Sequence, residues 1–281
     1  MLLNLYSLWV VIFLISNSSI YSGESITSSD AAYREMCKKA AGQTHIFQNF
    51  RSLPDYTNAI GENEGIKFAD YIINNAPKEI LERIATFQKL ESIGNPSTTS
   101  YPALGNFSGP TLRYIVIADH VNKLFDLPMH AKIVEIGAGF GGQCYILSRL
   151  NNFSQYYIYD LPETEALIEK VMANLNVKNV KCLPLHARLP EKQIDLLISN
   201  YAYSECDRIT QLDYFEKVIK KADRGYIIYN QTARNVFGLD SLTPKEFMQL
   251  LKDHDMHPQM HGELISTAHN NFLILWDRTR K

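Results

Sequence analysis

The sequence predicts an α/β fold built on a parallel sheet. From residue 131 onward, short apolar segments alternate with segments of helical period, as expected for strands joined by crossover helices. The first of these strands, Lys132–Ile136, is apolar along most of its length and is expected to be buried on both faces. It leads into a turn with Gly137, Gly139 and Gly141, which let the backbone approach a ligand closely. We therefore expect a ligand site where this strand ends.

Length and composition are those of a globular protein with one large or two small domains. The chain has 281 residues, of which 46% are hydrophobic and 21% are charged. Its net charge of −2 and its lack of a basic block give no general attraction to nucleic acid, so no such partner is expected. The four cysteines lack metal-ligand spacing, so we expect free thiols and no metal site.

Residues 1–23 form an apolar leader. The segment Leu2–Ile15 is broken by only two polar residues, and a polar stretch follows, as in a secretory signal peptide. The apolar part is short for a membrane span, and no Lys or Arg precedes Arg34. A cleaved signal, a membrane-associated tail and a non-native start or buried helix all remain open. The leader therefore points to export or membrane association.

Residues 24–128 are expected to form a mostly helical extension. A linker leads into a helix that ends near Ala41, and Ser28–Asp30 offers residues that can cap its start. Further helices are predicted at Ile66–Asn75, Pro77–Leu90 and Thr111–Phe125. Two segments rich in Gly, Pro, Ser or Asn are predicted to be loops, namely Phe47–Gly65 and Glu91–Pro110.

Residues 129–281 are expected to hold the sheet and its crossover helices. The predicted strands are Lys132–Ile136, Gln155–Tyr159, Val180–Leu183, Ile194–Ser199, Gly225–Tyr229, Gln259–Leu264 and Phe272–Trp276. The predicted helices are Gly141–Arg149, Pro162–Leu175, Thr210–Lys221 and Thr243–Asp253. The last two strands have no helix between them, which indicates a final hairpin-like pair.

Two acids stand at the ends of the first two strands. Glu135 would repel a pyrophosphate but suits a cationic ligand such as S-adenosylmethionine; alternatively, it caps backbone amides of the turn. Asp160 follows the glycine turn at the spacing of an acid that accepts hydrogen bonds from ribose hydroxyls. Asp160 can also cap the helix that begins near Pro162.

Three segments carry a resemblance to a known family. The pattern E-x-G-x-G-x-G, from Glu135 to Gly141, resembles the first motif of class I S-adenosylmethionine-dependent methyltransferases. Tyr157–Thr164 resembles the Y-D-L-P-E-T segment of a bacterial family named for sugar O-methylation, and Ser199–Glu205 resembles a later segment of that family. The resemblance runs from about Asn95 to the C-terminus.

The resemblance implies a fold, a cofactor and a set of contacts. The fold is the Rossmann-like, seven-stranded class I methyltransferase sheet, whose last strand runs antiparallel, and the cofactor is S-adenosyl-L-methionine. His186 lies in the loop expected beside the adenine, where a backbone amide is the favoured contact, and it can equally be a surface residue. The expected cofactor contacts are Glu135, Gly137, Ala138, Gly139, Gly141, Asp160, Leu161 and His186.

In the resembled fold, the loop after the fourth strand faces the transferred methyl group. An alcohol is a poor nucleophile near neutral pH, so its methylation requires a positioned base. We expect Glu205 to be that base, with Tyr203 and Tyr201 orienting the substrate. Alternatively, Glu205 begins the next helix and stays solvated, or it pairs locally.

The segment Glu91–Arg113 can form a lid over the cofactor, with Arg113 or Tyr114 reaching the cofactor carboxylate or the substrate. The alternative is a packed linker. The acceptor implied by the resemblance is a hydroxyl group of a small molecule, sugar or glycan.

Two other functions remain open. One is an exported or membrane-tethered binding protein without catalysis; the leader favours it, whereas S-adenosylmethionine is made in the cytoplasm. The other is an NAD-dependent oxidoreductase, which Glu135 and the lack of a second α/β half disfavour. The sequence does not indicate an oligomeric state.

Overall fold

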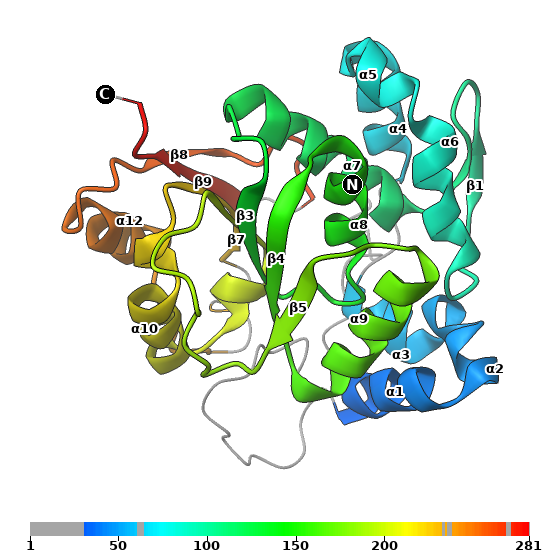
Figure 1. The fold of residues 1–281 in the computed structure, drawn as a ribbon, viewed down its shortest axis with the longest axis horizontal. Helices are drawn as coiled ribbons and strands as arrows, with labels where there is room; N and C mark the ends of the chain where they lie inside the picture. The colour runs from blue at the N-terminus through cyan, green and yellow to red at the C-terminus, as the bar shows by residue number, and fades with distance from the viewer. Residues whose placement is uncertain (1–30, 61–64, 232–233, 235–237, 268–270, 281) are drawn as a thin grey trace, which may run out of the picture.

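The computed structural model describes residues 31–60, 65–231, 234, 238–267 and 271–280. The predicted leader, residues 1–23, lies outside them. A seven-stranded sheet in the order β5-β4-β3-β6-β7-β9-β8 forms the centre of the molecule (Figure 1). Its strands are β3 (Ala131–Ile136), β4 (Phe153–Tyr159), β5 (Val180–Leu183), β6 (Leu196–Asn200), β7 (Arg224–Asn230), β8 (Gln259–Gly262) and β9 (Asn271–Asp277).

Strand directions confirm the predicted fold class. The five strands from β5 to β7 are mutually parallel, and β9 pairs antiparallel with both β7 and β8. All seven predicted strands exist, with ends within two residues of the prediction. The antiparallel β9 and the strand order are those of the Rossmann-like methyltransferase sheet that the resemblance implied.

Helices cover both faces of the sheet, because its central strands are apolar on both sides. One face packs against α7 (Gly109–Leu124), α8 (Gly142–Leu150) and α9 (Pro162–Asn174). The other face packs against α10 (Arg208–Lys217) and α12 (Pro244–Lys252), with the short η5 (Ile219–Lys221) continuing from α10. The result is a three-layered core.

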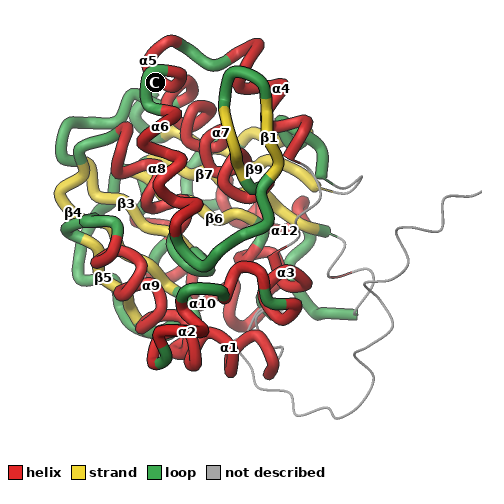
Figure 2. The backbone as a smooth tube through the Cα atoms, turned by 90° about the vertical axis from the view of Figure 1, so that its right-hand side faces the viewer, coloured by secondary structure: helices red, strands yellow, loops and turns green. Residues whose placement is uncertain are grey.

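The N-terminal helices extend the layer that contains α7, α8 and α9. Helix α1 (Ala31–Gly42) packs on α9, and α4 (Gly65–Asn75) packs on α7. Figure 2 shows α6 (Ile84–Phe87) in front of α8, a contact that also joins the extension to the sheet layer. Short helices complete the extension: α2 (Thr44–Phe47), α5 (Lys78–Leu81), η2 (Phe50–Ser52) and η3 (Gln88–Ser92).

Three predictions for the extension are wrong. The segment predicted as a loop, Phe47–Gly65, holds η2 and α3 (Pro54–Ile60), which begins at a proline suited to the first helical turn. The predicted loop Glu91–Pro110 contains a small hairpin of β1 (Thr99–Tyr101) and β2 (Gly105–Phe107), whose three-residue strands are too short to show an alternating pattern. The helix predicted at Pro77–Leu90 is broken into α5, α6 and η3.

A buried arginine joins the extension to the rest of the fold. Arg51 is 1% exposed, and its guanidinium lies 4.7 Å from the ring centroid of Phe140, in the glycine turn. The side chain of Glu91 lies 3.4 Å away and neutralises it. The guanidinium donates to the carbonyls of Leu90 (2.9 Å) and Ile93 (3.3 Å), to Ser108 Oγ (2.8 Å) and to Thr111 Oγ1 (3.2 Å).

Within the described residues, no helix is long and apolar enough to cross a membrane. All four cysteines are free, and Cys37, Cys144 and Cys206 are buried.

Replacing Arg51 should destabilise the protein strongly. Arg51→Met leaves the nearly buried carboxylate of Glu91 without its cation and several acceptors without a donor. The free energy of unfolding should fall by about 3–5 kcal/mol, as for other broken buried ion pairs. Urea unfolding measures this change.

Lys78→Met is the matched control, because it removes a Lys78–Glu82 pair whose side chains are 82% and 62% exposed. This variant should unfold at nearly the wild-type urea concentration. A loss below about 1 kcal/mol in Arg51→Met would contradict the structural role of Arg51.

Candidate active site

The glycine turn after β3 has a backbone that favours glycine. Gly137, Gly139 and Gly141 have φ values of 75°, 60° and 89°, in the left-handed region. The amide of Gly137 donates to the carbonyl of Tyr159 (2.8 Å), which ties the ends of β3 and β4 together. A Cβ on Gly137 would collide with Ala202, in η4 (Ala202–Glu205) after β6. The turn thus lies directly against the loop that follows β6.

Asp160 holds the turn from the end of β4. Its carboxylate accepts hydrogen bonds from the amides of Gly139 (2.9 Å) and Leu161 (2.7 Å), and it is 7% exposed. Burial raises the pKa of Asp160, and these amide hydrogen bonds oppose the shift. The N-cap of α9 is Leu161, so the alternative in which Asp160 caps that helix is wrong.

Glu135 lies buried beneath the same turn. Its carboxyl group is 1% exposed and accepts a hydrogen bond from the hydroxyl of Tyr156 (2.7 Å), on β4. Burial raises the pKa of Glu135 to about 8, and the nearby Asp160 adds to the shift. Among the described residues, no turn amide donates to Glu135, so the capping alternative is not observed. Two acids therefore lie close together at this turn, and both favour a cationic ligand.

The N-terminal extension adds a residue that the sequence analysis missed. Tyr56, on α3, is 2% exposed and packs edge-on against Phe140 of the turn, with ring centroids 6.0 Å apart. Within the described part of the chain, its buried hydroxyl has no hydrogen-bond partner. We predicted a loop at Phe47–Gly65 and therefore did not expect Tyr56 at the site. Pro54 followed by Asp55 is nevertheless typical of a helix start.

Tyr201 lies where β6 ends, in a strained backbone conformation. Its φ of 74° and ψ of −41° are rare for a bulky residue, and such strain is often stored at functional sites. Its hydroxyl donates to a carboxylate oxygen of Glu263. The guanidinium of Arg113 lies 5.4 Å from the ring centroid of Tyr201 and 5.8 Å from that of Tyr114. Tyr114 in turn packs on the glycine turn, since a Cβ on Gly142 would collide with it.

The structure separates the two residues predicted to act in catalysis. Glu205 is 6% exposed at the sheet edge and accepts a hydrogen bond from the amide of Asn230 (3.0 Å), at the end of β7. Helix α10 begins later, at Arg208, with Asp207 as its N-cap, so a solvated Glu205 at the start of that helix is wrong. The hydrogen bond from Asn230 agrees with the alternative of local pairing.

Tyr203 is not brought to this site, which corrects the expectation that it orients the substrate. Its side chain is fully buried in the core beneath α12, with its ring centroid 4.9 Å from that of Phe247. Its hydroxyl donates to the carbonyl of Gln211 (3.3 Å), and burial raises its pKa well above the usual range. Glu205 and Tyr203 both lie on η4, but their side chains have different neighbours. A role for one therefore does not imply a role for the other.

His186 lies in the predicted loop after β5, but its side chain turns to the surface. The imidazole is 59% exposed and lies 3.2 Å from the carboxylate of Asp213, on α10. A contact between this loop and adenine stays a prediction. Across the described residues, no three His, Cys, Asp or Glu side chains are placed to hold a metal ion.

No protein family and no curated protein matches this sequence. Several solved structures are similar to part of it. One is a SAM-dependent methyltransferase from Aquifex aeolicus, with 15% sequence identity and a TM-score of 0.43, over 57% of this chain and 88% of that one. Another is a S-adenosylmethionine-dependent methyltransferase from Clostridium acetobutylicum, with 10% identity and a TM-score of 0.46, over 59% of this chain and 89% of that one. Geranyl diphosphate C-methyltransferase from Streptomyces coelicolor is similar at 13% identity, with a TM-score of 0.45, over 60% of this chain and 81% of that one. Because these values are low, the fold assignment rests on the strand order, and the site rests on the contacts above.

The titration of Glu135 predicts that stability depends on pH. The folded protein keeps this proton up to about pH 8, whereas the ordinary pKa is 4.5. Between pH 4.5 and pH 8, the folded state therefore binds a proton at Glu135 that the unfolded state has lost. As a result, the free energy of unfolding falls as the pH rises towards 8. Glu135→Gln keeps an acceptor for Tyr156 but cannot ionise. Between pH 6 and pH 9, the wild type should lose about 2–3 kcal/mol relative to this variant in urea unfolding.

Glu216→Gln is the control, because Glu216 is 58% exposed on α10. Its stability difference from the wild type should be nearly the same at both pH values. If Glu135→Gln behaves like this control, the proposed titration of Glu135 is wrong.

Proposed function

We propose that the protein is an S-adenosylmethionine-dependent methyltransferase that acts on a hydroxyl oxygen. The observation that carries the proposal is the pair of buried carboxylates, Glu135 and Asp160, at a left-handed glycine turn where parallel strands end. A dinucleotide site would place a pyrophosphate against this turn and would further disfavour ionisation of Glu135, whereas a cationic ligand would favour it. A sulfonium nucleoside with an ammonium group suits the same acids.

The side chains around the turn fit such a cofactor. Asp160, whose carboxylate is oriented by the amides of Gly139 and Leu161, would accept hydrogen bonds from the ribose hydroxyls. Glu135 would compensate the positive charge from below the turn. Tyr56 offers a hydroxyl next to the turn. Ala138, Gly137 and Gly141 would place backbone against the ligand, and the loop at His186 would meet the adenine.

The bound cofactor would supply a methyl group on a positively charged sulfur, which an oxygen nucleophile can attack. The protein's main contribution is to hold the acceptor hydroxyl in line with that methyl group. We assign Glu205 as the base, because its carboxylate lies where parallel strands end and the Asn230 amide fixes its orientation. The acceptor proton would pass to Glu205 as the new carbon–oxygen bond forms. A sugar or glycan acceptor is supported by the sequence resemblance alone.

Calorimetric titration of the full chain with S-adenosylhomocysteine tests the cofactor. We expect saturable binding of this product and none of NAD. Asp160→Ala should weaken the binding about tenfold or more, because it removes an acceptor from two ribose hydroxyls. Asp70→Ala, which removes an exposed acid on α4, is the control and should bind as the wild type does.

A folded sample that binds NAD, or neither compound, would overturn the proposal. Binding of neither would favour the alternative of a non-catalytic binding protein.

Replacing the base should slow turnover without weakening cofactor binding. Glu205→Gln keeps the size of the side chain and an acceptor for Asn230, but it cannot take up the acceptor proton. With an acceptor found by screening hydroxyl compounds for transfer of a radiolabelled methyl group, kcat should fall by about 10²–10⁴-fold. Affinity for S-adenosylhomocysteine should not change. A kcat close to that of the wild type would remove Glu205 from the mechanism.

A further inference from the structure

The backbone is strained at Tyr201, where β6 leads into η4, the short helix of Glu205. The φ of 74° and ψ of −41° at Tyr201 lie near those of a γ-turn, which is rare for a residue with a side chain. Such a conformation persists only where the surrounding structure holds it. The contacts of Tyr201 should therefore include one that holds this conformation.

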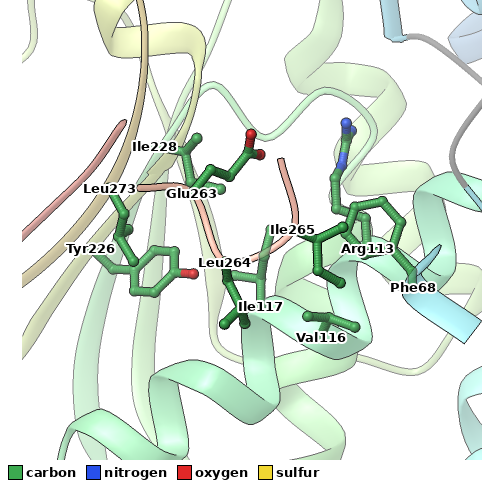
Figure 3. Close-up of a pocket in the computed structure, with 10 residues that line it drawn as sticks. All are labelled: Phe68, Arg113, Val116, Ile117, Tyr226, Ile228, Glu263, Leu264, Ile265 and Leu273. Carbon is green, nitrogen blue, oxygen red and sulfur yellow. The ribbon is translucent and has the colours of Figure 1, made fainter. Parts of the chain in front are cut away.

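Glu263, directly after β8, anchors the side chain of Tyr201. Its carboxylate accepts a hydrogen bond from the Tyr201 hydroxyl. The same carboxylate accepts from the amide (2.9 Å) and hydroxyl (2.8 Å) of Thr267 and from the side-chain amide of Asn271 (3.2 Å), which fix its position. Figure 3 shows this carboxylate at the end of a small pocket where the Arg113 guanidinium also lies, and that guanidinium is 5.4 Å from the ring centroid of Tyr201. The hydroxyl and the ring of Tyr201 are thus held by two different side chains.

The carbonyl of Tyr201 passes this constraint on to Glu205. It accepts hydrogen bonds from the amide (2.9 Å) and the hydroxyl (2.5 Å) of Ser204, the residue before Glu205. The Ser204 hydroxyl accepts in turn from the backbone amide of Asn230 (2.8 Å), whose side chain donates to Glu205 (3.0 Å). Because the backbone angles of Tyr201 set the direction of its carbonyl, they also set the position of Glu205.

The strand register joins the two carboxylates by a second route. Asn230 ends β7 and Asn271 begins β9, and these residues face each other in the antiparallel ladder. The side chain of Asn230 donates to Glu205, and that of Asn271 donates to Glu263. The proposed base and the anchor of Tyr201 are therefore both held from one end of the same strand pair.

We infer that Glu263 is a positioning residue for the base Glu205. It holds Tyr201 in the strained conformation that fixes η4, so the C-terminal strands determine where the proton-accepting carboxylate lies. The inference rests on the proposed function and deepens it, because it names what holds the base in place. A misplacement of about 1 Å in such a group can slow a reaction about 100-fold.

The kinetics of two variants test the inference. Glu263→Ala removes the anchor, and Tyr201→Phe removes only the hydroxyl that the anchor holds. With the acceptor found by the screen above, kcat should fall about tenfold or more in both variants. Affinity for S-adenosylhomocysteine, measured by calorimetry, should stay close to that of the wild type, because Asp160 and the glycine turn are unchanged.

Tyr157→Phe is the matched control. It also removes a tyrosine hydroxyl that donates to a carboxylate, that of Glu191 (3.0 Å), but this pair makes no contact with η4. Its kcat should stay close to that of the wild type.

The Glu205→Gln background separates positioning from a general loss of structure. Once the base is gone its position no longer matters, so adding Glu263→Ala to Glu205→Gln should change kcat by less than about twofold. Two results would overturn the inference. One is a wild-type kcat in both single variants, and the other is a fall in the Glu205→Gln background as large as the fall in the wild type.

Urea unfolding tests the strain itself and needs no acceptor. Tyr201→Gly should unfold at a higher urea concentration than Tyr201→Ala, because glycine adopts a positive φ without strain. Tyr157, inside β4, is the control position, and there the glycine variant should unfold at the lower concentration. The same order at Tyr201 as at Tyr157 would contradict the strain on which the inference depends.

The two proposals can fail separately. If the wild type does not bind S-adenosylhomocysteine, the proposed function fails, and the urea comparison still decides whether Tyr201 is strained. If the wild type binds it and transfers the methyl group, but kcat does not respond to Glu263→Ala or Tyr201→Phe, only the inference fails.

Discussion

The placement of the site depends on the buried guanidinium of Arg51. It gathers the carbonyls of η3 and the segment after it, the first turn of α7 and the ring of Phe140 around one charge. Ser108 and Thr111, which accept its hydrogen bonds, precede Arg113 and Tyr114 by less than two helical turns. The position of those two side chains against Tyr201 and the glycine turn thus follows from a contact made by the N-terminal extension. The same sheet without this extension would lack the contacts that hold Arg113 and Tyr114 at the proposed site.

Close approach between elements gives the site its electrostatic character. Gly137 lies against Ala202, so the end of β3 is in direct contact with the loop after β6. Burial raises the pKa of both Glu135 and Asp160, and the charge of Asp160 further raises the pKa of Glu135. Such a pair has a free energy cost that a positively charged ligand would lower.

The parts of the fold set by local pattern could be predicted from the sequence. Buried parallel strands and glycine turns have strong local signatures, so the sheet, its final antiparallel strand and the glycine turn were all predicted correctly. Long-range contacts left no such signature. Arg51 and Tyr56 lie in a segment with an irregular pattern, and their roles come from residues far away in the sequence. Tyr203 was assigned to the site by its position in a motif, but the turn of η4 directs its side chain into the core beneath α12.

A crystal structure of the protein with S-adenosylhomocysteine would show directly whether the glycine turn and Asp160 bind the cofactor. We expect the ligand over the glycine turn, with its ribose hydroxyls bonded to Asp160 and its amino group on the Glu135 side. Density for the ligand elsewhere, or a ribose that makes no contact with Asp160, would contradict it.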